Sequence, residues 1–170
     1  LALRLADFYA EVYRASPRLV DVRQTPFPAR LRGDLTFLRR VKVLSEPDFV
    51  GLIRASVTLS PDSVWVGYDY TDPVLKNFVL RTKSRSLCAV DVEGLVGNSL
   101  IGAGTVKASI RWLGKHKNVF YQRLTDAGTP SFHTYLPFVE LYFIAEWTKR
   151  NIFEGKDRKI DRRLFNRFLG

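Results

Sequence analysis

Few residues in this sequence could carry acid–base or nucleophilic chemistry. Its 170 residues include two histidines, His116 and His133, and one cysteine, Cys88. His116 lies between two lysines with no acid beside it, and His133 stands where a helix is predicted to begin. A single cysteine excludes an intrachain disulfide, and these three residues are too few for a Cys/His metal cluster. We therefore expect no catalytic residue, no metal site and no enzymatic activity.

A glycine-rich stretch, Gly97–Gly104, superficially resembles a phosphate-binding loop. A Walker motif needs Gly-Lys-Ser/Thr after its spacer, because the lysine and the hydroxyl hold the phosphate and Mg²⁺. Neither that sequence nor a G-x-G-x-x-G dinucleotide pattern is present. The glycines are predicted to serve a turn or a close helix contact, and Asp69 and Asp72 are predicted to serve turn and capping roles. We expect no cofactor.

The charge balance points instead to an anionic partner. The formal net charge is +10, and such a surplus suits RNA, an acidic protein surface or an anionic membrane surface. Eight Lys and Arg residues lie between Lys149 and Arg167. A basic helix there could contact phosphates or an acidic protein. The residues predicted to contact the partner are Arg158, Lys159, Arg162, Arg163 and Arg167.

Apolar residues at helical spacing predict helices along most of the chain. The predicted helices are Leu1–Ala15, Phe49–Leu59, Leu87–Ile101, Val119–Asp126 and Asp157–Phe168, with others beginning at Asp34, Asp72, Thr105 and Ser131. Residues 17–31 carry three prolines and are predicted to be extended. Residues 61–70 fit either a short strand or one helical turn. Residues 87–101 also compete as strand, but four glycines at or just beyond this segment favour a helix with a break.

The helix-ending and helix-capping residues after Val119–Asp126 predict a helical hairpin. Gly128 suits a helix C-terminus, Pro130 cannot continue the helix, and Ser131 can cap the next one. Extended to the other elements, this layout predicts one all-α domain over residues 1–170. The predicted architecture is a short α-solenoid of about seven or eight helices in antiparallel pairs.

The hairpin also carries a family resemblance. Phe120–Tyr135 resembles the junction between two pentatricopeptide (PPR) repeats, and the matching residues are Tyr121, Leu124, Gly128, Pro130, Ser131, Thr134 and Tyr135. PPR arrays read one RNA base per repeat through two side chains, which the resemblance places here at Ser131 and Leu136. Because the aliphatic Leu136 cannot hydrogen-bond a base edge, the resemblance implies a degenerate RNA-reading code.

A small, basic, PPR-like chain with a degenerate code resembles the euglenozoan-specific PPR-like subunits of the mitochondrial ATP synthase catalytic head. That resemblance implies an accessory structural subunit that docks on the non-catalytic nucleotide-binding subunits of the head and performs no chemistry. The alternative is an organellar RNA-binding PPR-like protein or a mitochondrial ribosomal component.

Two further features bear on location. The sequence has no methionine, even at position 1, which suits a mitochondrial matrix protein whose presequence has been removed. No apolar run reaches the roughly 18 residues that a membrane-spanning helix needs. We therefore expect a soluble protein without a membrane span.

Overall fold

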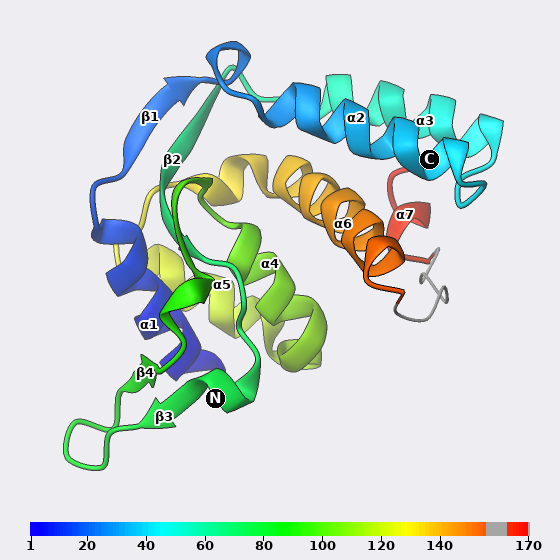
Figure 1. Ribbon diagram of the computed structural model, residues 1–170. Helices are drawn as coiled ribbons and strands as arrows, with labels where there is room; N and C mark the ends of the chain where they lie inside the picture. Colours follow the sequence, from blue (N-terminus) through cyan, green and yellow to red (C-terminus); the bar gives the residue numbers. More distant parts are fainter. Residues whose placement is uncertain (156–162, 170) are drawn as a thin grey trace. The chain divides into compact units, whose positions relative to one another are not determined.

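The structure is a computed structural model that describes residues 1–155 and 163–169, and it is mixed α/β (Figure 1). The predicted all-α solenoid of paired helices is therefore wrong. The helices are α1 (Ala2–Arg14), α2 (Phe27–Arg40), α3 (Glu46–Thr58), α4 (Ala103–Ala108), α5 (Lys117–Asp126), α6 (Leu136–Phe153) and α7 (Arg163–Asn166). The strands are β1 (Arg18–Asp21), β2 (Ser63–Tyr70), β3 (Phe78–Leu80), β4 (Leu87–Ala89) and β5 (Leu95–Leu100).

The chain forms two compact units, each built from two separate stretches of sequence. The first contains all of β3, β4 and β5 and most of β1 and β2; it comprises residues 1–20 and 64–134, and we call it the sheet unit. The second comprises residues 21–63 and 135–170, and we call it the helical unit. Each unit is described by itself below.

A three-stranded sheet in the order β1-β2-β5 decides one segment that the sequence left open and corrects one predicted helix. Residues 63–70 form strand β2, which settles the ambiguous segment 61–70. The predicted helix 87–101 is instead strand β4, a 3₁₀ turn at 92–94 and strand β5. The glycines and β-branched residues of this segment lower its helix propensity, and antiparallel pairing of β4 with β3 and of β5 with β2 supplies backbone hydrogen bonds.

Pairing between β2 and β5 is irregular at one point. Val66 lies opposite Leu100 and Asp69 opposite Val96, with a register shift between Gly67 and Asp69. A bulge of this kind re-aims the side chains that follow it. Here both Asp69 and Tyr70, although adjacent in sequence, are buried.

A second antiparallel pair, β3 with β4, replaces the helix predicted to begin at Asp72. Leu80 lies opposite Leu87, and the backbone N–H of Arg81 donates to the carbonyl of Ser86. The basic run at 81–85 is therefore a hairpin loop and not a helix C-terminus. Apolar residues on both short strands can pair across the ribbon, which favours strand over helix in this segment.

The core of the sheet unit forms where α1 packs against α5. Tyr9 and Tyr13 of α1 are fully buried with Phe120 and Phe132, in edge-on ring contacts. Helix α5 agrees closely with the prediction for 119–126, and Gly128 has the positive φ of 67° predicted for the turn after it. The predicted helix end and the turn at Gly128 are therefore confirmed, but Ser131 does not cap the next α-helix, because α6 begins at Leu136 after a 3₁₀ turn at 132–135.

The helical unit packs α2 against α3 and α6. Helix α2 begins at Phe27, not at Asp34 as the sequence suggested, because Pro28 is tolerated in a first helical turn. Asp34 is buried in mid-helix, where its Oδ1 accepts a 2.6 Å ion pair from Lys149 Nζ of α6. In the described part of the chain, none of the helices has the length and apolar character needed to cross a membrane.

Candidate functional site

The side of α2 that faces away from the core is the most distinctive surface of the helical unit. Steps of four residues place Arg32, Thr36 and Arg40 along this side, while Leu31 and Leu35 are buried on the other. A groove follows the outer side, lined by Pro28, Ala29, Arg32, Gly33, Thr36, Phe37 and Arg40. We call it the α2 groove.

The α2 groove is open and basic. Apart from its chain neighbours and the backbone of its own helix, no atom lies within 4 Å of the place where a Cβ on Gly33 would stand, so the groove is unobstructed at this point. No carboxylate is present among the described residues that line it. Asp34, the acidic residue of α2, is buried and paired with Lys149. The groove therefore presents positive charge that its own helix does not neutralise.

The arginines of α2 divide into paired and unpaired groups. Arg39 is neutralised by Glu46, with 3.2 Å between guanidinium and carboxylate, and it also lies over the ring of Phe49. Arg32 and Arg40 are exposed, and neither forms an ion pair with a carboxylate within residues 1–155 and 163–169. Eight residues of helix separate them, which is about 12 Å. These two guanidinium groups are available to an anion.

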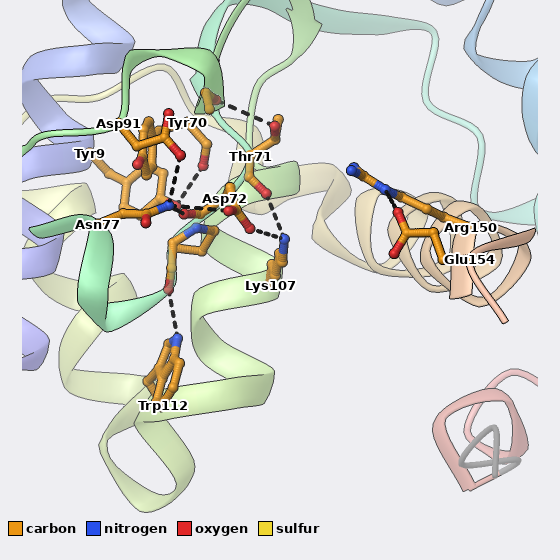
Figure 2. A network of polar contacts seen from close by, with 12 residues as sticks. Tyr9, Tyr70, Thr71, Asp72, Asn77, Asp91, Lys107, Trp112, Arg150 and Glu154 are labelled. Atoms are coloured by element: carbon orange, nitrogen blue, oxygen red, sulfur yellow. Dashed lines mark hydrogen bonds and ion pairs between the residues drawn. The ribbon is translucent and has the colours of Figure 1, made fainter. Parts of the chain in front are cut away.

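Two phenylalanines form a stack at the groove. The rings of Phe37 and Phe153 are nearly parallel, with centroids 4.9 Å apart, and Phe153 of α6 is 69% exposed. Lys149 Nζ lies 5.9 Å from the centroid of the Phe37 ring. Beyond Lys149 along α6, Arg150 is held by Glu154 at 2.8 Å (Figure 2). An exposed aromatic stack beside unpaired arginines suits a ligand with both flat rings and phosphates.

The polar network of the sheet unit is structural (Figure 2). Asp72 accepts from Lys107 Nζ at 2.7 Å and from Asn77 Nδ2 at 3.1 Å, and Asn77 also donates to Asp91 at 3.3 Å. Burial alone would raise the pKa of Asp72, but the hydrogen bond and charge of Lys107 bring this pKa below its usual value. Lys107 also donates to the carbonyl of Thr71. These groups bind one another, so we assign them a structural role that ties the segment after β2 to α4.

Asp69 is the second buried carboxylate of the sheet unit. Its Oδ2 accepts from the backbone N–H of Gly104 at 2.9 Å, and its Oδ1 accepts from the Tyr13 hydroxyl at 3.1 Å. Burial raises the pKa of Asp69 to about 7 despite these hydrogen bonds. Because the group is fully buried, it is closed to a substrate, and its hydrogen bonds to Tyr13 and Gly104 give it a structural role. Among the described residues, no group of three or more His, Cys, Asp or Glu is placed to hold a metal ion.

The structure describes only part of the predicted set of site residues. Arg158, Lys159 and Arg162 lie outside the described residues. Arg163 is exposed at the start of α7, whereas Arg167 forms an ion pair with Glu140 at 3.3 Å. The two positions implied by the PPR resemblance are Ser131, exposed after α5, and Leu136, half-buried at the start of α6.

The α2 groove itself was missed. Because residues 17–31 were predicted to be extended, Arg32 was never placed on a helix face. The apolar positions Phe27, Leu31, Leu35 and Leu38 have helical spacing and could have shown that the helix begins before Asp34.

Comparison of the chain with protein-family models, curated proteins and solved structures finds no match. Its function is therefore argued from its own surface chemistry.

Proposed function

We propose that this chain is a non-catalytic RNA-binding component of a larger ribonucleoprotein assembly and that it contacts RNA through the α2 groove. One observation carries the proposal. Arg32 and Arg40 are unpaired in a groove whose described lining has no carboxylate, beside the exposed stack of Phe37 and Phe153.

Single-stranded RNA is the anion that this surface fits best. Arginine binds phosphate oxygens with two parallel hydrogen bonds, and two arginines about 12 Å apart can contact different phosphates of one strand. Phe153, 69% exposed, offers a ring face on which an unpaired base can stack. An acidic protein surface would use the arginines and leave the ring without a matching partner. This combination favours RNA.

Exposed apolar residues in the sheet unit support membership of an assembly. On and beside the β3–β4 ribbon, the large apolar residues left at least two-fifths exposed are Leu75, Val79, Leu80, Val90, Val92, Leu95 and Val96. Val92 is 75% exposed. Exposed apolar residues gathered on one segment are typical of a protein–protein contact. A basic surface for RNA and an apolar surface for protein together fit a structural component such as a mitochondrial ribosomal protein.

The expected docking on the ATP synthase head rested in part on a layout of paired helices, which the chain does not have. This docking stays a prediction, and we assign none of the described surfaces to it. Co-purification with head subunits after RNase treatment would favour that role over RNA binding.

An RNA-binding titration with a matched control tests the proposal. We expect wild-type protein to bind a single-stranded RNA of about 16 nucleotides, measured by fluorescence anisotropy over a salt series. Replacing both arginines, Arg32→Ala with Arg40→Ala, should weaken binding about tenfold or more. It should also reduce the slope of log K against log salt by about 1.4, since two phosphate contacts are lost.

The control removes the same charge from other surfaces. Arg54 and Lys76 are exposed and do not line the α2 groove, so Arg54→Ala with Lys76→Ala should leave the slope nearly unchanged. Equal weakening in both double variants would show binding by net charge alone. That result, or an absence of RNA binding by the wild type at low salt, would overturn the proposal.

A further inference from the structure

The sheet unit has a cleft of its own, lined by four arginines. It lies between α1, α5 and the β3–β4 loop. The charged and hydroxyl side chains that line it are Arg4, Asp7, Glu11, Arg14, Ser84, Arg85, Ser86 and Arg123. We call it the arginine cleft.

The arginines of the cleft differ in how they are held. Arg123 pairs with Asp7 at 2.7 Å, and Arg14 donates to the backbone carbonyl of Ala127. Arg4 and Arg85 form no ion pair within the residues that the structure describes. Because Arg123 neutralises Asp7, the lining keeps a positive surplus, with Glu11 as its remaining carboxylate.

The loop presents Arg85 in an unusual backbone conformation. Its φ is 53°, in the left-handed region that glycine and asparagine favour. The Ser84 and Ser86 hydroxyl oxygens lie 2.7 Å apart beside it, so two further hydrogen-bonding groups line the cleft. Arginine is costly at such a position, and its guanidinium is unpaired in the described part of the chain.

We propose that the arginine cleft binds the phosphate group of a ligand. Arg4 and Arg85 supply paired N–H donors that match phosphate oxygens, and the one serine hydroxyl whose O–H is not used in the Ser84–Ser86 hydrogen bond adds a neutral donor. A terminal phosphate or a pyrophosphate fits a recessed cleft with several donors better than a phosphodiester within a strand, because it exposes more oxygens. The phosphate can come from the 5′ end of an RNA or from a small phosphorylated molecule. This inference concerns another surface than the α2 groove and does not depend on RNA binding there.

Calorimetric titration of the full chain with inorganic pyrophosphate tests the site. We expect wild-type protein to bind pyrophosphate and the double variant Arg4→Ala with Arg85→Ala to bind about tenfold more weakly or worse. The matched control is Arg81→Ala with Lys83→Ala, which removes two charges near the same loop from residues that do not line the cleft. This control should retain most of the affinity.

A gain-of-binding variant guards against an effect of unfolding. Glu11→Gln removes the remaining carboxylate of the lining and is expected to tighten pyrophosphate binding, which a damaged fold would not do. The proposal is overturned if the wild type does not bind pyrophosphate, if both double variants lose affinity equally, or if Glu11→Gln does not tighten binding.

Two RNA arms then identify the source of the phosphate. They compare a 5′-phosphorylated RNA with its 5′-hydroxyl counterpart in the Arg32→Ala, Arg40→Ala background, which lacks the α2 arginines. A preference for the phosphorylated end that disappears when Arg4 and Arg85 are also replaced supports the site with an RNA end as ligand. Pyrophosphate binding without such a preference supports the site with a small phosphorylated molecule as ligand.

Discussion

Replacing Gly104 with alanine is expected to lower the free energy of unfolding of the sheet unit by about 4 kcal/mol or more. An added Cβ would stand 2.6 Å from Oδ1 of Asp69 and closer still to the carbonyl oxygen of Tyr70. Neither group can withdraw easily. The Tyr70 carbonyl accepts a 2.8 Å hydrogen bond from the buried Tyr9 hydroxyl, and Asp69 accepts the N–H of Gly104 itself.

The matched control is the same substitution in the other unit. Gly33 lies in the interior of α2 with nothing within 4 Å of its Cβ position. Gly33→Ala should therefore stabilise the helix by about 0.5–1 kcal/mol. Urea unfolding followed by circular dichroism measures both variants. A Gly104→Ala protein that unfolds at the wild-type urea concentration would show that α4 does not lie against Asp69 and Tyr70 as described.

Asp69→Asn is expected to change how stability depends on pH. The carboxyl group has a native pKa of about 7 against an ordinary value of 3.8, because it is buried. Between these pH values the folded state binds more protons than the unfolded state, so this group makes wild-type stability fall as pH rises. A shift of this size corresponds to roughly 4 kcal/mol. The asparagine variant lacks this decline. Between about pH 4 and pH 8, its free energy of unfolding should therefore rise relative to that of the wild type by roughly 4 kcal/mol.

The neighbouring tyrosines do not titrate in this pH range, so they do not add to the difference between the two proteins. Burial raises the pKa of Tyr9 and Tyr13 well above the ordinary value, so both stay neutral throughout. The Tyr13 hydroxyl can accept from an asparagine amide as it now donates to the carboxylate. Asp72→Asn serves as a control with the opposite expected effect. Because the pKa of Asp72 is lowered in the folded state, its ionised carboxylate stabilises the wild type above the ordinary pKa, and the asparagine variant loses that stability. Denaturant unfolding at a series of pH values measures the free energy of unfolding of both proteins. If that free energy changes with pH in the same way for the wild type and for Asp69→Asn, the raised pKa of Asp69 is contradicted.

What the sequence could predict of the fold was local. The helix at 119–126 and the turn at Gly128 follow from residues next to one another, and both are confirmed. The strands are different, because β5 gains its partner from β2, some 30 residues away. A short apolar segment such as 95–100 has no periodicity that separates strand from helix, and distant pairing decides it.

The candidate site shows the same limit. The positive surplus predicts an anionic partner, but it does not say which arginines are available to it. That depends on tertiary contacts: Glu46 neutralises Arg39, Glu140 engages Arg167, and Lys149 is drawn to the buried Asp34. The basic residues near the C-terminus, such as Arg158 and Arg167, are predicted to contact the partner from charge density alone. On α2, the contacts leave Arg32 and Arg40 without an ion pair among the described residues, in a helix that begins before the predicted start at Asp34.

Mapping the RNA contact by ultraviolet cross-linking tests the central claim most directly. The full-length protein would be bound to a single-stranded RNA, irradiated, digested and examined by mass spectrometry for peptides that carry a nucleotide. The account predicts adducts at Phe37 or Phe153 that disappear in the Arg32→Ala, Arg40→Ala variant. Adducts confined to residues 1–20 and 64–134, or unchanged in that variant, would contradict the assignment of the α2 groove as the RNA contact.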